Sequence, residues 1–289
     1  MGSQQLFGRF CRVTIFKNGE PTAYVYENLR VTFEISKTGV GYSNKASISL
    51  TNLNQKSRIK FVKGFTIKLE AGYENLNELL YFGDIIKVTT ERKGTDTTTK
   101  FEVGDAERQL TSAIFDNSYP SGTQLVTIIQ DLIKAMGVQQ STVIGIPDFT
   151  FGKGIAINGS VKRSLDKLLN ARKLEWSIQN GSIQIMPISK HSGENAVVLS
   201  KDSGLIGVHS ITKTGYEFDS LLNPKLMPGR AVKLISSTYS GFFKLNKVTF
   251  SGDTHGHNWH AKCEAVKVRE LNGLRVGAGA NIATVSSEE

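Results

Sequence analysis

The chain has 289 residues, enough for about two domains, and 39% of them are apolar, as in ordinary packed protein. The formal charge is +9, but the Lys and Arg residues are dispersed, with no run of four and no interleaved aromatic platform. This pattern argues against sequence-reading contact with DNA and favours a solvated basic surface or one that faces an acidic protein. No apolar stretch approaches the roughly 18 residues of a transmembrane helix, and the N-terminus lacks the layout of a secretory signal. We therefore expect synthesis in a cytoplasm and no membrane anchor.

The two cysteines, Cys11 and Cys263, lie far apart in the sequence and form no metal-binding spacing. Both occupy the apolar phase of predicted strands, so we expect buried free thiols rather than a disulfide.

Residues 1–117 are predicted to form a first β module. Apolar residues alternate with polar ones in six or seven short runs, and turn signals such as Asn18-Gly19 separate them. A short helix or turn is expected at 55–61. This spacing is typical of an antiparallel barrel or sandwich.

Residues 118–190 change pattern and predict a small α+β insert. Apolar residues recur at helical spacing over 123–136, with Thr123 as N-cap and Gly137 as stop, and again over 161–172 after Ser160. Between these helices, 145–159 reads as a Gly/Pro-rich connection. Asn180-Gly181 between two alternating runs predicts a type I′ hairpin. The apolar helix faces are candidate subunit interfaces, although either helix could simply cover its own unit; the residues concerned are Leu125, Ile129, Leu132, Leu165 and Leu168.

Residues 191–270 predict a second β module. Strands are expected through Val232 and Leu234, over 243–250 with a break in phase near Asn246, and over 259–265. Residues 271–289 are rich in Gly, Ala and Ser, and this tail is expected to be mobile unless a partner orders it.

Several motifs, in order, resemble those of phage tail and baseplate hub proteins, which join the tail tube to the central spike. In the first module they are Ala71-Gly72-Tyr73, followed about ten residues later by Phe82 and Gly83. The insert has a helix with the pattern Leu-Asp-x-Leu-Leu at 165–169 and then a Trp-containing hairpin. The second module matches at Leu221, Leu222, Pro224, Leu226, Pro228, Gly229, Val232 and Leu234, and then at Gly252, Asp253, Thr254 and Trp259. The resemblance covers about residues 8–270, and many members of the family are longer.

This resemblance implies a mainly β fold of two antiparallel tail-tube-like barrel modules with the insert between them. It implies a structural, non-enzymatic virion protein at the distal end of the tail, without a cofactor. Three copies would form a ring in which six similar modules adapt a sixfold tail tube to a threefold spike. The implied partners are the tube or a distal tail protein, the spike and the tape measure protein, with DNA passing through the channel without specific binding.

Other functions are weighed against this one. His255, His257 and His260 lie close together beside Asp253 and Cys263, but a polar hairpin tip with solvated histidines is favoured over a metal site. A cell-wall hydrolase would need a convergent acid pair or a nucleophile elbow, and neither is found in the sequence. A secretion-system spike component would share the β modules but would continue into a spike-forming domain.

Overall fold

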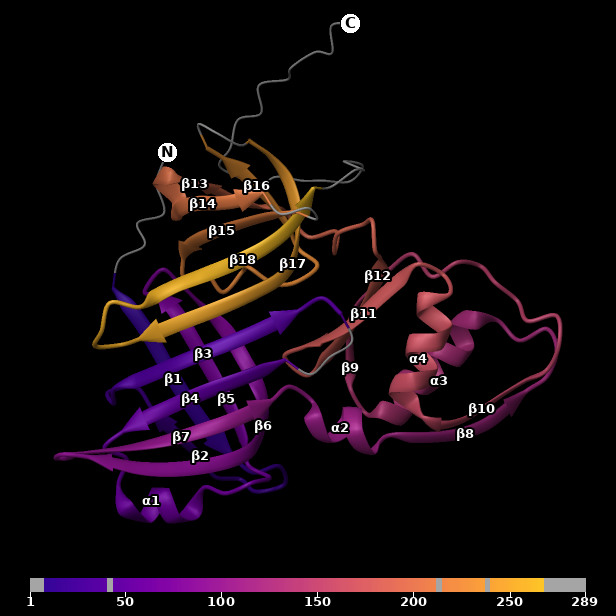
Figure 1. Cartoon of the computed structure of the whole chain (residues 1–289). Helices are drawn as coiled ribbons and strands as arrows, with labels where there is room; N and C mark the ends of the chain where they lie inside the picture. Colours follow the sequence, from indigo (N-terminus) through magenta and orange to yellow (C-terminus); the bar gives the residue numbers. More distant parts are fainter. Residues whose placement is uncertain (1–7, 41–43, 212–214, 237–239, 268–289) are drawn as a thin grey trace, which may run out of the picture.

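The computed structural model describes residues 8–40, 44–211, 215–236 and 240–267. Figure 1 shows two β modules stacked on one another, with the insert projecting to one side of both. The predicted mobile tail, 271–289, lies outside the described residues.

The first module contains seven strands and one short helix, in agreement with the alternation in the sequence. In β3, for example, Val31, Phe33 and Ile35 are buried and the residues between them are not. The elements are β1 Arg9–Phe16, β2 Ala23–Tyr26, β3 Val31–Thr38, β4 Lys45–Thr51, α1 Gln55–Lys60, β5 Thr66–Tyr73, β6 Leu76–Lys93 and β7 Asp96–Gly104.

The second module contains six strands. The predicted break in phase near Asn246 is confirmed, since the pairing of β17 with β18 shifts register between Leu245 and Lys247. The elements are β13 Val197–Ser200, the 3-10 turn η1 Lys201–Ser203, β14 Leu205–Ile211, β15 Tyr216–Leu221, β16 Ala231–Ile235, β17 Ser240–Asp253 and β18 Trp259–Lys267.

The two modules share one sheet and one apolar core. The main path runs β14-β15-β18-β17-β3-β4-β7-β6-β5-β1-β2, while β16 pairs with β17 and β13 with β16. The mainly β, antiparallel character is therefore confirmed. The expectation of barrels needs correction, because within the described residues this path stays open at β14 and β2 and neither module closes on itself.

The insert has its own core and two small sheets. The hairpin β11–β12 pairs with β9 in parallel, and β8 pairs with β10. Strand β10 occupies part of the segment predicted as an irregular connection, and β8, β9 and α2 were not predicted. The elements are α2 Glu107–Ser112, β8 Ile114–Tyr119, α3 Leu125–Met136, β9 Gln139–Val143, β10 Ile155–Ser160, α4 Val161–Asn170, β11 Leu174–Gln179 and β12 Ser182–Pro187.

The two predicted helices are present, but their N-terminal capping differs from expectation. Thr123 does not cap α3: its hydroxyl donates to Pro120 O at 2.8 Å, and Gln124 is the N-cap residue. Ser160 precedes α4 without a side-chain capping bond. The predicted stop at Gly137 is confirmed by its left-handed φ of 70°.

The apolar faces of α3 and α4 pack inside the insert. The prediction that they form a subunit interface needs correction, and the alternative that each helix covers its own unit holds. Their buried contacts lie in the insert's core, and the exposed fraction is at most 7% for the five candidate residues Leu125, Ile129, Leu132, Leu165 and Leu168.

Two other local predictions are confirmed. Asn180 and Gly181 both have positive φ, 53° and 81°, as a type I′ turn requires. Cys11 and Cys263 are buried free thiols.

None of the helices in the described residues is long and apolar enough to span a membrane.

Candidate functional site: the seam between the β modules

The two modules meet along a strand pair that we call the seam, formed by β3 and residues 247–253 of β17. The pairing is antiparallel and uninterrupted, from Lys247 opposite Thr38 to Asp253 opposite Thr32. Since β3 also pairs with β4, and β17 with β18, backbone hydrogen bonds cross from one module to the other without a gap. The modules are therefore held in a fixed relation to each other.

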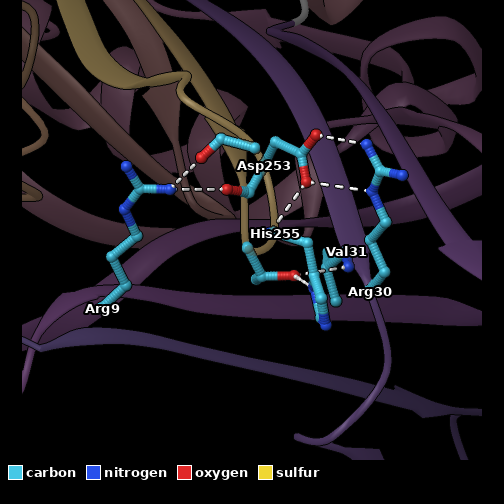
Figure 2. A network of polar contacts seen from close by, with 7 residues as sticks. Arg9, Arg30, Val31, Asp253 and His255 are labelled. Atoms are coloured by element: carbon cyan, nitrogen blue, oxygen red, sulfur yellow. Dashed lines mark hydrogen bonds and ion pairs between the residues drawn. The ribbon is translucent and has the colours of Figure 1, made fainter.

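One end of the seam is closed by the Gly252-Asp253-Thr254 turn (Figure 2). The Arg30 guanidinium donates to both carboxylate oxygens of Asp253, at 3.2 and 2.7 Å, and this pairing holds the pKa of Asp253 below its ordinary value. Thr254 exchanges two hydrogen bonds with the backbone of Val31, both at 3.0 Å. Arg9 of β1 donates to Asp253 O at 2.9 Å. The turn thus contacts two strands of the first module.

Two of the predicted family motifs touch at this end. Trp259 Nε1 donates to Gly72 O at 3.1 Å, which joins the second-module Trp to the Ala71-Gly72-Tyr73 motif of the first. The Trp259 ring also packs edge-on against Phe33 at 5.5 Å. Position 252 requires glycine, because a Cβ there would lie 2.2 Å from the Phe33 ring. These motifs are therefore packing partners across the seam.

The opposite end of the seam contains a buried lysine, Lys37 of β3, with no exposed surface. Its ammonium donates to Asn180 Oδ1 at 2.7 Å and contacts Met227 Sδ at 3.4 Å, and it lies 5.8 Å from the centre of the Tyr81 ring. One side chain thus contacts both β modules and the hairpin turn of the insert.

The hairpin turn is held by the carboxylate of Asp105, which follows β7. Asp105 accepts hydrogen bonds from the backbone N–H groups of Asn180 and Gly181, at 2.7 and 2.8 Å. Asn44 Nδ2 donates to Ile178 O at 2.7 Å and lies 3.4 Å from Asp105 Oδ2. The insert is therefore fixed to the first module by buried polar contacts with defined geometry.

Burial shifts the ionisation of both charged groups in this network. It lowers the pKa of Lys37 from 10.5 to about 7, with the Asp105 charge acting in the opposite direction. It raises the pKa of Asp105, against the effects of Lys37 and of the backbone donors.

The pKa of Lys37 predicts a pH effect on stability. The unfolded chain binds more protons than the folded one between pH 7 and 10.5, so the contribution of Lys37 to stability rises with pH through that window. In Lys37→Met this contribution is absent. We expect the free energy of unfolding of the wild type, relative to K37M, to rise between pH 7 and 9 by up to about 1.4 kcal/mol per pH unit.

The measurement is urea unfolding at each pH, with the exposed Lys153→Met as matched control. The control curve should run parallel to wild type. A K37M curve parallel to wild type over the same range would contradict the assigned pKa.

A second set of contacts joins the insert to the second module. Lys244 of β17, almost fully buried, pairs with Glu175 of β11 and donates to Ile188 O at 3.0 Å. Gln184 of β12 donates to Pro228 O at 3.0 Å, next to Gly229, whose φ is 86°. The turn at Pro228-Gly229, two residues of the second-module motif, therefore lies against the insert.

The remaining motif residues have packing positions. A Cβ at Gly83 would lie 2.6 Å from Gly104 O, so β6 and β7 approach closely there, next to the partly buried Phe82. Leu222 and Pro224 are buried, Leu221 is partly buried, and the Leu222 N–H donates to Trp259 O at 3.2 Å.

The histidine cluster is not assembled as a metal site. His255 and His257 are exposed and His260 is half-buried, and His255 Nδ1 lies 2.9 Å from Thr254 Oγ1. In the described part of the chain, no group of three or more His, Cys, Asp or Glu residues has the arrangement to hold a metal ion.

Sequence reasoning missed Lys37, Asp105 and Asn44, the polar residues that join the three units. The sequence did contain a signal for Lys37, because it follows Val31, Phe33 and Ile35 at the apolar phase of β3. A lysine in that phase is a candidate for a buried charge with a dedicated partner. Nothing local in the sequence marks Asp105 or Asn44.

Comparisons with known proteins agree with this architecture. The tail protein of 43 kDa from prophage MuSo2 of Shewanella oneidensis is similar over 89% of this chain and 98% of its own, with TM-score 0.63 and 12% identity. A tail protein from Neisseria meningitidis MC58 has TM-score 0.63 and 9% identity, over 90% of this chain and 97% of its own. The E. coli c3393 protein, a component of the type VI secretion system, has TM-score 0.62 and 12% identity, over 90% of this chain and 78% of its own. At these identities the likeness shows the fold.

The family is shown by sequence. No curated protein matches the chain. A family model, Baseplate hub gp41, matches residues 10–259, which include the insert, the seam, the first module from the second residue of β1 onward and the second module as far as the start of β18. The chain therefore belongs to the baseplate hub gp41 family and is a structural protein of the tail baseplate.

Proposed function

We propose that three copies of this protein form the hub ring of a phage tail, which adapts a sixfold tail tube to a threefold spike and encloses the channel for DNA. The observation that carries the proposal is an internal duplication. Five strands have the same order in both modules, β3-β4-β7-β6-β5 in the first and β14-β15-β18-β17-β16 in the second. Two such modules per chain and three chains would present six similar units.

The duplication extends to backbone detail. Gly64 and Gly229 precede equivalent strands, have φ of 96° and 86°, and donate their N–H groups to Ile85 O and Leu245 O. After these acceptors both long strands shift register, at Ile85/Lys87 and at Leu245/Lys247. One difference is that β1 pairs with β5 antiparallel, whereas β13 pairs with β16 in parallel.

Short sequence echoes accompany the structural match. Residues 64–69, GFTIKL, correspond to residues 229–234, GRAVKL, and residues 87–89 and 247–249 both read KVT. The pair Lys87 opposite Glu102 corresponds to Lys247 opposite Glu264.

The polar face of the shared sheet suits a channel wall that DNA must pass without being held. Lys247 pairs with Glu264 at 2.8 Å, and Lys262 with Glu217 at 3.5 Å, so the positive charges of these two lysines are balanced by acidic neighbours. A wall with unpaired cations would attract phosphates and slow their transit. We predict that the excess positive charge of the chain faces outward or toward other tail proteins.

The proposed role is structural and not enzymatic. In the described part of the chain, burial raises the pKa of two carboxyl groups, Asp105 and Glu175, and these are engaged by backbone donors and by Lys244 respectively. The proposed partners are the tail tube or distal tail protein on one face, the spike on the other, and the tape measure protein. The division into units at 117, 190 and 270 stays a prediction.

Copy number tests the proposal. Quantitative mass spectrometry of purified tails should give three copies per particle, and native mass measurement of released hubs should give three times the 31.7 kDa of one chain. Six or twelve copies per tail would contradict the adapter role. Release of reducing ends or peptide from cell walls by the purified chain would contradict the non-enzymatic assignment.

A further inference from the structure

The duplicated modules also differ at the outer half of their longest strand. In the second module, residues 247–253 of β17 pair with β18 on one side and with β3 on the other. The equivalent residues 87–93 of β6 pair with β7 on one side. Among the described residues, no strand pairs with the other side.

The side chains on these equivalent segments reflect this difference. Val248 and Phe250 are fully buried. Of their counterparts in β6, Val88 is partly buried and Thr90 is exposed. The outer half of β6 thus follows the same register shift and has the same backbone direction as a segment that receives a neighbouring strand in the other module.

Strand β14 is the counterpart of β3. Each lies beside the strand that follows it, β3 beside β4 and β14 beside β15, at the same place in the duplicated order. While β3 is enclosed between β4 and β17, β14 ends the sheet in the described part of the chain.

The composition of β14 differs from that of a protected edge. Natural edge strands usually carry charges that oppose pairing with another chain. Strand β14 reads LIGVHSI, with no Lys, Arg, Asp or Glu, and the exposed fraction of Ile206 is 57%. The outer half of β6 carries Lys87, Glu91, Arg92 and Lys93, so the pairing would place no like charges opposite one another.

We propose that β14 of one copy adds antiparallel to the outer half of β6 in the next copy, as β3 adds to β17 within one chain. This inference rests on the proposed trimer and names the surface that closes it. The occupant is a second copy of this chain, because it is the internal duplicate of the strand that fills the same position. The contact is head-to-tail, so it closes a ring rather than a twofold dimer.

The internal pairing sets the register. Glu34 of β3 lies opposite Ser251 of β17 in the seam. The counterpart of Glu34 is Ser210 of β14, because Ser210 pairs with Glu217 as Glu34 pairs with Ser47. The counterpart of Ser251 is Glu91 of β6, so Ser210 of one copy should lie opposite Glu91 of the next. Directly opposed residues of antiparallel strands have Cα atoms about 4.5–5.5 Å apart, within disulfide range. Native thiols do not interfere, because Cys11 and Cys263 are buried.

The test is disulfide formation in assembled tails that carry full-length Glu91→Cys/Ser210→Cys. Under mild oxidation we expect a covalent trimer on a non-reducing gel. The matched control Thr90→Cys/Ser210→Cys should stay monomeric, since alternate residues of a strand point to opposite faces. Tails that contain a mixture of the two single variants, Glu91→Cys and Ser210→Cys, should give dimers, and either single variant alone none.

A second double variant, Lys93→Cys/Gly207→Cys, tests the same register. Lys93 is the counterpart of Asp253, and Gly207 is the counterpart of Thr32, which lies opposite Asp253 in the seam. This variant replaces the first if the first does not assemble. Three copies per tail with no cross-link from either pair, or with equal cross-linking of the Thr90 control, would overturn the strand pairing and leave the trimer standing. A copy number other than three would overturn the trimer itself.

Discussion

Asp105→Ala should lower the free energy of unfolding by about 3–5 kcal/mol. Asp105 has no exposed surface, and its carboxylate accepts from the backbone N–H groups of Asn180 and Gly181. Alanine would leave both donors buried without an acceptor, and each such group costs about 1–3 kcal/mol. It would also remove the acidic charge that favours protonated Lys37.

Urea unfolding measures the total effect, and hydrogen exchange locates it. The amides of Asn180 and Gly181 should lose protection from exchange in D105A. Amides in the centre of β3 and β17 should keep their protection, because they exchange only when the seam itself opens. Asp105→Asn, which retains one acceptor oxygen, should fall between D105A and wild type. The exposed Asp148→Ala is the matched control and should change stability by less than about 0.5 kcal/mol. A D105A protein within 1 kcal/mol of wild type would refute the docking role of this carboxylate.

Local features of the fold could be predicted because local chemistry determines them. The Asn180-Gly181 hairpin follows from two residues that tolerate positive φ, and the break in β17 follows from an interruption of alternation at Asn246. Helix α3 ends at Gly137 for the same kind of reason. These features can be predicted without knowing which distant strand lies beside them.

The seam could not be predicted in this way, because β3 and β17 lie more than 200 residues apart and both read as ordinary amphipathic strands. Alternation predicts which face of a strand is buried but not which edge it pairs with. The insert strands β8 and β10 were missed because β8 reads IFDNSY, with most of its side chains exposed. The resemblance to hub proteins predicted two similar modules, and the similarity of GFTIKL to GRAVKL would have supported that prediction. Neither indicated that β3 of the first module pairs with β17 of the second.

The second large effect is expected at Gly72, where two motifs meet. Its φ is 154°, and a Cβ on this residue would lie 2.0 Å from Leu76 O, a backbone atom of the same hairpin that cannot move independently. Gly72→Ala must therefore displace the β5–β6 connection and with it the carbonyl that accepts from Trp259 Nε1. We expect a loss of about 3 kcal/mol or more in the free energy of unfolding, measured by urea denaturation. Gly152→Ala is the matched control, since a Cβ there meets no atom within 4 Å.

A double-mutant cycle then separates local strain from the contact across the seam. Trp259→Phe alone removes the indole donor and leaves Gly72 O buried without its partner, at a cost of about 1–3 kcal/mol. If Gly72→Ala has already displaced that carbonyl, Trp259→Phe should cost clearly less in the alanine background. Full additivity of the two changes would mean that the strain at Gly72 stays within its own hairpin, and the two motifs would then be neighbours without energetic coupling.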